Sequence, residues 1–242
     1  MKTDNMESKV KVLILITGSI AAVRIPLLVS QLIKENFEIK CVISENAKKL
    51  IQPLSLSVLS RNPCILENDQ WSHHQSKPLH IDLCNWADIL LIAPLTATTL
   101  SKWVNGNADG LIPSILIANF KPIIVAPAMN TKMWLNQAVQ KNYALLENNK
   151  NVLSLQPSQG VLACDEIGIG KIPPNDLIQL AIEFILSQNK RHYCKDLINK
   201  KFLITGGCTS EKIDAARNIT NKSCLLYTSD AADEGLGVDL GG

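Results

Sequence analysis

The chain has 242 residues, 46% of them hydrophobic, which is enough to bury a full core in one large domain or in one domain plus a fragment. Its 24 basic and 22 acidic residues give a formal net charge of only +2, which leaves no electrostatic footprint for nucleic acid or an acidic membrane surface and favours a small-molecule partner. The seven cysteines are an odd number without C-x-x-C spacing, which indicates a reducing cytoplasm and not a disulfide framework.

The first apolar run, residues 10–23, resembles a short signal peptide. Lys11 interrupts it, however, and Arg24 and Pro26 follow it closely. It is also far shorter than the roughly 20 residues that a membrane helix needs. We therefore interpret this run as a buried strand that leads into a helix.

Short apolar runs that are separated by segments of helical spacing recur along the chain, at residues 10–17, 38–43, 89–93 and 122–126. Residues 25–34 and 177–187 show the apolar stripe of a helix that packs on a core. Strands that are apolar on both faces and joined by helical crossovers predict a doubly wound α/β fold with a parallel sheet, of the flavodoxin-like or Rossmann-like kind. In such folds ligands bind outside the carboxyl ends of the strands.

A glycine turn, T-G-S-I-A-A at residues 17–22, follows the first run. Small residues in such a turn often serve only close packing. The turn also aims backbone N–H groups and a positive helix end at an anion, which favours a mononucleotide phosphate, with Ser44 after the second run as a further donor. The turn lacks the G-x-G-x-x-G of dinucleotide sites.

Two more polar loops follow the third and fourth runs: A-P-L-T-A-T-T at residues 93–99 and P-A-M-N-T-K-M-W at residues 127–134. The hydroxyls of the first loop could bind a ligand, but capping of the next helix is the commoner use and the one that the residues alone favour. Asn130 in the second loop could hold a carboxylate or a flavin edge, or belong to an ordinary turn.

His80 lies in L-H-I-D-L, shortly before the third run. A lone histidine beside apolar residues is usually structural, so a catalytic role is the minority reading from the residues alone. His73 and His74 resemble solvated loop residues. We expect no metal site, because the spacing offers no H-x-x-x-H pair and no nearby cysteine cluster.

Cys164 lies among glycines and carboxylates in residues 160–171, a segment that we predict to be a loop. Cysteine is usually a small buried apolar residue. Burial is less expected in a glycine-rich loop, which favours a reactive thiol. The neighbouring carboxylates would raise the pKa of this thiol and suit a proton donor better than a thiolate nucleophile.

Taken in order, five motifs resemble those of the flavin-containing cysteine decarboxylases, the family of phosphopantothenoylcysteine decarboxylase: G-S-I-A-A, L-H-I-D-L-x-x-W-A-D, A-P-x-T-A-x-T, P-A-M-N-x-x-M-W and A-C-D-E-x-G-x-G-K. The resemblance covers about residues 9–187, and five ordered motifs are far more specific than any one of them. It implies FMN as the cofactor, decarboxylation of 4′-phospho-N-pantothenoyl-L-cysteine in coenzyme A biosynthesis, and a homo-oligomer, trimer or higher, with sites between subunits.

The resemblance also implies a role for each matching residue. Oxidation of the substrate's cysteine side chain to a thioaldehyde involves His80, Asn130 holds the carboxylate, and Cys164 protonates the ene-thiolate after carbon dioxide leaves. The cofactor contacts implied are Gly18, Ser19, Ile20, Ser44, Thr96, Thr98 and Met129, and the substrate contacts are Asn130, Met133, Ala163 and Lys171. The family usually has asparagine where this chain has Thr98, so the hydrogen bond expected there must change.

Alternative functions stay open within the same fold. A peptidyl-cysteine decarboxylase or a flavin prenyltransferase would share the strand-end motifs, and a non-catalytic flavin-binding subunit would be expected had the cysteine or the histidine been lost. Both Cys164 and His80 are present.

Residues 188–223 follow the decarboxylase domain, and a polar linker, S-Q-N-K-R-H-Y at 187–193, spans the boundary. The segment continues with L-I-T-G-G-C-T-S-E at 203–211, which resembles the start of phosphopantothenate–cysteine ligase. We expect a truncated ligase whose CTP and Mg²⁺ sites are missing, behind a decarboxylase domain at residues 1–187. Residues 224–242 resemble a translated transposon-end adapter from sequencing libraries, and we interpret them as a non-biological tail.

Overall fold

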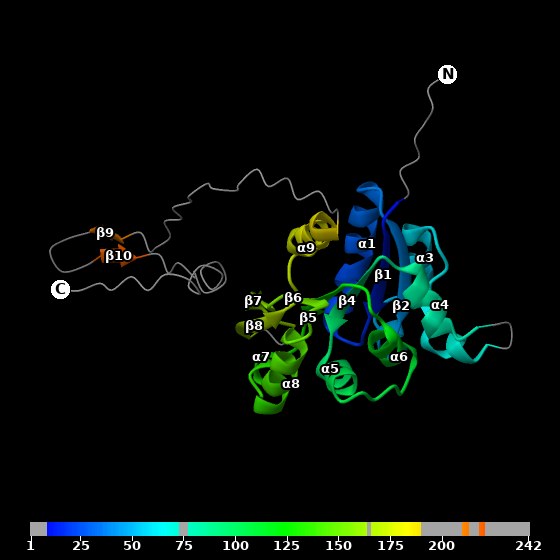
Figure 1. Ribbon diagram of the computed structural model, residues 1–242. Helices are drawn as coiled ribbons and strands as arrows, with labels where there is room; N and C mark the ends of the chain where they lie inside the picture. Colours follow the sequence, from blue (N-terminus) through cyan, green and yellow to red (C-terminus); the bar gives the residue numbers. More distant parts are fainter. Residues whose placement is uncertain (1–8, 73–76, 164–165, 190–209, 213–217, 221–242) are drawn as a thin grey trace, which may run out of the picture. The chain divides into compact units, whose positions relative to one another are not determined.

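The computed structural model describes residues 9–72, 77–163, 166–189, 210–212 and 218–220 (Figure 1). The chain divides into two units, residues 1–191 and 192–242. The predicted tail, 224–242, lies outside the described residues, as does most of the predicted ligase start. In the second unit two short strands, β9 (Ser210–Lys212) and β10 (Asn218–Thr220), pair antiparallel.

The first unit is built on one six-stranded sheet in the order β3-β2-β1-β4-β5-β6, with all pairs parallel. Its strands are β1 (Lys11–Ile16), β2 (Glu38–Ile43), β3 (Ile65–Leu66), β4 (Ile89–Leu95), β5 (Ile123–Pro127) and β6 (Val152–Ser154). The strand order reverses between β1 and β4, as in Rossmann folds. The predicted doubly wound α/β fold is therefore confirmed, and the order is the Rossmann one.

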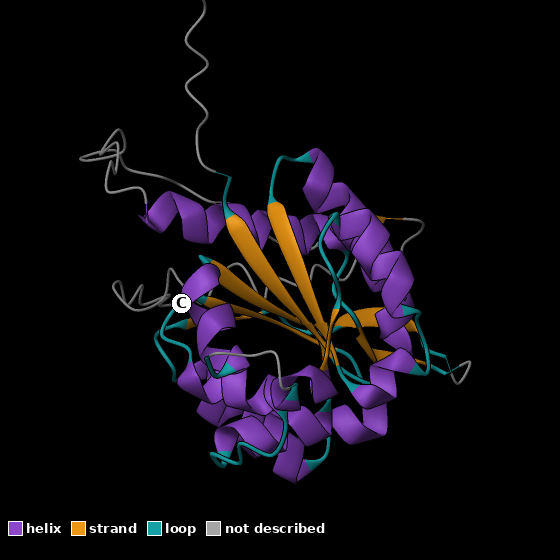
Figure 2. Ribbon diagram, turned by 90° about the vertical axis from the view of Figure 1, so that its right-hand side faces the viewer, coloured by secondary structure: helices purple, strands orange, loops and turns teal. Residues whose placement is uncertain are grey.

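Helices cover both faces of this sheet (Figure 2). One face carries α1 (Ile25–Lys34) and α9 (Asn175–Asn189), with α3 (Pro53–Ser60) toward the β2 edge. The other face carries α4 (Leu79–Trp86), α5 (Ala97–Val104), α6 (Leu111–Ala118) and α8 (Gln137–Glu147). Both predicted helices, residues 25–34 and 177–187, are present.

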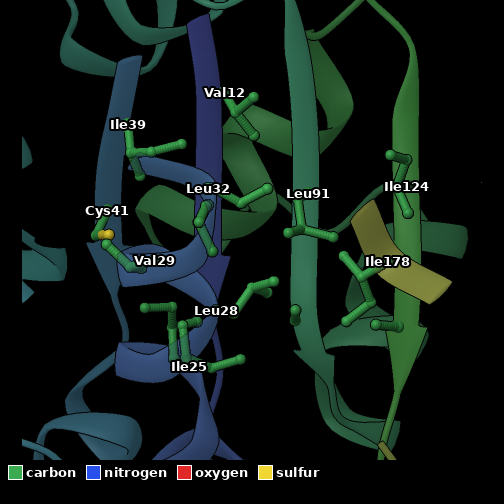
Figure 3. Packing of buried hydrophobic residues seen from close by; sticks show 14 of the residues in the cluster. Val12, Ile25, Leu28, Val29, Leu32, Ile39, Cys41, Leu91, Ile124 and Ile178 are labelled. Carbon is green, nitrogen blue, oxygen red and sulfur yellow. The ribbon is translucent and has the colours of Figure 1, made fainter. Parts of the chain in front are cut away.

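Each central strand divides its side chains between two cores. In β1, Val12 and Ile14 point into the core under α1, whereas Leu13 and Leu15 point into the core under α4 to α6. The buried stripe of α1, which includes Leu28, packs against the first of these cores (Figure 3). Complete burial of one such side chain contributes about 1.5–3 kcal/mol. A sheet apolar on both faces holds the strand ends, and hence the loops that follow them, in fixed positions.

Three expectations need correction. Residues 160–171 are not a loop throughout: β7 (Ser158–Val161) and β8 (Ile167–Lys171) form an antiparallel hairpin. The edge strands β3 and β6 were not predicted, because two and three residues are too few to show a period. Helix α9 runs to Asn189, so the first residues of the predicted linker 187–193 are helical.

Candidate active site

Four loops meet at the carboxyl edge of the sheet, where the strand order reverses. They follow the neighbouring strands β2, β1, β4 and β5. Because carboxyl ends of parallel strands lie at one edge, these loops enclose a common space. We call it the switch-point cavity, a hollow of about 370 Å³ lined by Thr17, Gly18, Ser19, Ser44, Asn46, Glu67, Thr96, Ala97, Thr98, Thr99, Lys102, Ile112, Pro113, Ala128, Met129, Asn130 and Met133.

The polar residues of this cavity cap the helices that start around it: η1 (Ile20–Arg24), α2 (Glu45–Lys48), α5 and α7 (Thr131–Trp134). The caps are Ser19 to the Ala21 N–H at 3.4 Å, Ser44 to the Ala47 N–H at 3.2 Å, Thr96 to the Thr99 N–H at 3.4 Å and Asn130 to the Lys132 N–H at 2.8 Å. The capping role that the sequence favoured for the threonine loop is confirmed. The first N–H groups of a helix have no partner inside it, so several positive helix ends surround one cavity.

Thr17 joins the loop after β1 to the end of β4, the two neighbouring strands at which the strand order reverses. Its Oγ1 donates a hydrogen bond of 2.6 Å to the backbone oxygen of Pro94 and lies 3.3 Å from Oγ1 of Thr96. Thr17 is only 2% exposed, so this bond is shielded from water and fixes the β1 loop against the β4 loop.

Gly18 makes the closest approach in the cavity wall. A Cβ added to Gly18 would lie 2.5 Å from the Cβ of Asn46 in α2. The absence of a side chain therefore lets the β1 loop and the start of α2 pack together, which brings Ser19 and Ser44 to the same cavity.

A second hollow, the hairpin cavity, has a volume of about 520 Å³ and lies between η1, the Met129 loop and the β7–β8 hairpin. It shares Ser19, Ala128, Met129 and Asn130 with the switch-point cavity. The backbone N–H of Met129 donates to the backbone oxygen of Gly170 at 3.0 Å, which docks β8 onto the loop. Ile20, Ala163 and Lys171, which the sequence assigned to the site, line this second hollow.

A third hollow, the α4 cavity, has a volume of about 960 Å³ and is lined by His80 in the first turn of α4. It shares only Glu67 and Lys102 with the switch-point cavity. Lys102 Nζ lies 2.8 Å from Asp109 Oδ2, and this hydrogen bond together with the charge of Lys102 lowers the pKa of the Asp109 carboxyl. Among the described residues, no three His, Cys, Asp or Glu side chains come together as a metal site.

The structure thus gathers most of the predicted site residues but not all of them in one place. Eight predicted site residues line the switch-point cavity, three more (Ile20, Ala163 and Lys171) line the hairpin cavity alone, and His80 lines neither. Cys164 lies outside the described residues; in the sequence it comes between β7 and β8. Asn46, Glu67 and Lys102 were missed. Lys102 lies one helical turn after Thr98, and that spacing was the signal that could have found it.

Comparison with known proteins places this architecture in a family. The flavoprotein family matches residues 1–186. The chain belongs to the flavoprotein family. No helix in the described parts of this flavoprotein is long and apolar enough to cross a membrane.

Curated relatives of this flavoprotein include the coenzyme A biosynthesis bifunctional protein CoaBC of Bacillus subtilis (strain 168), which is 33% identical over 217 residues, 88% of this chain and 51% of that protein. CoaBC of Borreliella burgdorferi is 34% identical over 219 residues, 90% of this chain and 54% of that protein. The chain therefore spans about half the length of these relatives. The probable thymidylate synthase of Schizosaccharomyces pombe is 36% identical over 170 residues, 68% of this chain and 27% of that protein.

Solved structures share the flavoprotein fold. A PPC decarboxylase mutant complexed with pantothenoylaminoethenethiol has a TM-score of 0.67 at 32% identity, covering 74% of this chain and 99% of its own. The FMN binding protein AtHal3 has a TM-score of 0.65 at 32% identity, and the match covers 76% of this chain and 100% of AtHal3. The peptidyl-cysteine decarboxylase EpiD has a TM-score of 0.59 at 26% identity, and the match covers 74% of this chain and 99% of EpiD. This flavoprotein is thus related to PPC decarboxylases, and its structural neighbours include an FMN-binding protein, AtHal3.

Proposed function

We propose that this chain binds FMN and decarboxylates 4′-phospho-N-pantothenoyl-L-cysteine to 4′-phosphopantetheine, a step of coenzyme A biosynthesis. The observation that carries this proposal is the switch-point cavity, where one hollow collects Gly18, Ser19, Ser44, Thr96, Thr98, Met129 and Asn130. The relationship to CoaBC and to a PPC decarboxylase supports the choice of substrate.

The donor set of the cavity fits a flavin mononucleotide. Hydroxyls and helix N-termini on the β1 and β2 side suit a phosphate and ribityl oxygens, whereas Ile112, Pro113 and Met133 offer an apolar wall for a planar ring. When bound, FMN supplies the reversible two-electron oxidation of the substrate that makes loss of carbon dioxide easy.

The chain's own residues would orient the substrate and supply the proton. Asn130 is held at the head of α7 by its bond to the Lys132 N–H and lines both connected cavities, so its amide can orient a carboxylate that enters from the hairpin side. We assign the final protonation to Cys164, whose flanking strands β7 and β8 wall the hairpin cavity.

The direct test is to purify the full chain, record its absorbance and assay carbon dioxide release. We expect a bound flavin spectrum and turnover of 4′-phospho-N-pantothenoyl-L-cysteine, with slower turnover of a peptide that ends in cysteine. A colourless protein that takes up no added FMN would contradict the cofactor assignment. A preference for the peptide would favour the peptidyl-cysteine decarboxylase instead.

We also propose that the active form is a homo-oligomer, trimer or higher, whose sites are completed between subunits. His80 and Asn130 line different cavities of one chain, so a second copy is the simplest source of a histidine beside Asn130. Ile20, Val161 and Ile167, beside the hairpin cavity, are more than half exposed, as expected of residues that a neighbouring subunit covers.

Mixing two inactive variants tests this arrangement. His80→Asn and Asn130→Ala should each lower turnover by roughly 10²–10⁴-fold, because each removes one group that acts on the substrate. Co-expression of the two variants should restore part of the activity if the two residues come from different subunits. Activity that stays at the level of the separate variants would place both residues in one chain.

The parent protein, we propose, continues into a phosphopantothenate–cysteine ligase. Alignment with CoaBC covers 88% of the chain, which extends past the family match at residues 1–186. The sequence of the intact gene beyond codon 223 tests both this proposal and the interpretation of residues 224–242 as a tail.

A further inference from the structure

The hairpin cavity has a charge pattern that the α4 cavity does not share. Its described lining carries two cations, Arg24 and Lys171, and no carboxylate. The α4 cavity is lined by three carboxylates, Glu45, Glu67 and Asp109, and by two lysines, Lys77 and Lys102, of which Lys102 is paired with Asp109. An anion would therefore be attracted more strongly to the hairpin cavity, whose described cations face no carboxylate of the lining.

Among the described residues, no carboxylate forms an ion pair with either cation of the hairpin cavity. The ion pairs among the described residues are Lys48 with Glu45, Lys102 with Asp109 and Lys132 with Glu166, so Arg24 and Lys171 belong to none of them. Both can therefore bind an anion without first breaking an ion pair.

Both side chains start from anchored backbone. Arg24 ends η1 and is the N-cap residue of α1, whose buried stripe is fixed in the core. Lys171 ends β8 and follows Gly170, whose backbone oxygen is bonded to the Met129 N–H at 3.0 Å. A pair of cations on anchored elements loses less conformational entropy on binding than a pair on free loops.

Much of the remaining cavity wall is apolar, with Ile20, Val23, Leu162 and Ile172 among its members, and Asn130 is one of the residues that it shares with the switch-point cavity. A ligand whose carboxylate reaches Asn130 would run along this apolar wall and meet the cations with its other end. That arrangement suits an elongated molecule that is anionic at both ends.

We propose that Arg24 and Lys171 bind the terminal phosphomonoester of the substrate and so select the phosphorylated compound over its dephosphorylated form. The inference rests on the proposed function, which it deepens by assigning the residues that recognise the phosphate. Guanidinium and ammonium groups are the side chains that bind phosphate by charge-assisted hydrogen bonds. A peptide substrate has no such phosphate, so the same pair would disfavour peptides by comparison.

The test measures binding to the full chain loaded with FMN, with 4′-phosphopantetheine and pantetheine as the probes. Neither probe can be decarboxylated, so calorimetry reports affinity independently of turnover. Arg24→Gln and Lys171→Gln should each weaken binding of 4′-phosphopantetheine by about 10- to 100-fold and leave pantetheine binding unchanged. Lys141→Gln on α8, which lines none of the three cavities, is the matched control and should change neither.

The outcomes separate this inference from the proposed function. If the wild-type chain binds both probes equally, the phosphate site is refuted even if carbon dioxide release is observed. If the chain releases no carbon dioxide from 4′-phospho-N-pantothenoyl-L-cysteine or from a peptide that ends in cysteine, yet prefers 4′-phosphopantetheine by way of both cations, the proposed function fails and the phosphate site stands. Loss of FMN from both variants, with the preference between probes intact, would assign the cations to the cofactor's phosphate and overturn the inference.

Discussion

Replacement of Gly18 by alanine should produce a folded chain that no longer retains FMN. The new Cβ would lie 2.5 Å from the Cβ of Asn46, so the β1 loop and α2 must move apart. That movement separates Ser19 from Ser44 across the switch-point cavity. Overpacking of this kind typically costs about 1–3 kcal/mol, and here the cost falls on the flavin-bound state. Flavin content after gel filtration and a fluorescence titration with FMN measure the loss.

A second substitution distinguishes this steric cause from a general loss of stability. Asn46→Gly removes the atom that the new Cβ would meet, at a cost of about 0.3–0.5 kcal/mol in helix propensity, because asparagine is already a poor helix former. The double variant Gly18→Ala/Asn46→Gly should bind FMN more tightly than Gly18→Ala alone. If the double variant binds FMN no more tightly than Gly18→Ala alone, a clash between the β1 loop and α2 is not the reason that Gly18 is needed.

The central strands could be predicted from sequence because they are buried on both faces. In β1 and β4 every residue but Lys11 is buried, which leaves continuous apolar runs. The edge strands β3 and β6 carry no such run, and their residues are only partly buried. Their pairing depends on the neighbouring strand, which a local pattern cannot reveal.

The strand-end residues of the site were also predictable, since the parallel topology brings all strand ends to one edge. Ser44 and Thr96 directly follow their strands, Asn130 comes three residues after the end of β5, and all three cap the next helices. Asn46 lies within α2, where no motif marks it, and its place in the cavity follows from how that helix turns after β2. Glu67 begins η2 (Glu67–Trp71) directly after β3, and it was missed because that two-residue strand was not predicted.

The glycines of residues 160–171 were interpreted as signs of a loop, whereas Gly168 and Gly170 permit close packing of a strand. A Cβ on Gly168 would meet Thr131, and one on Gly170 would meet the Met129 backbone oxygen. Glycine composition alone does not distinguish flexibility from close approach. The distinction needs the partner, which lies some forty residues earlier in the chain.

Gly170→Ala should therefore lower turnover strongly while the six-stranded sheet keeps its stability and its flavin. Gly170 has φ of +149°, a region that other residues rarely adopt, and its new Cβ would overlap the Met129 oxygen. Met129 follows β5 of the central sheet, whereas β8 belongs to a separate two-stranded sheet, so the hairpin is the part that gives way. The residues between its strands, Cys164 among them, would then be misplaced. Misplacement by about 1 Å can lower a rate about 10²-fold.

Gly160→Ala in the same hairpin is the matched control. Its Cβ would lie 3.4 Å from Cδ of Lys171, a flexible side chain, so the free energy of unfolding should stay within about 0.5 kcal/mol of wild type. Because Lys171 is assigned to substrate binding and not to the chemical step, turnover at saturating substrate should be kept. Carbon dioxide release, flavin absorbance and protease sensitivity of the hairpin distinguish the two variants. Full turnover by Gly170→Ala would show that docking of β8 on Met129 is not needed for chemistry. Loss of flavin together with turnover would show that the Met129 loop moves instead of the hairpin.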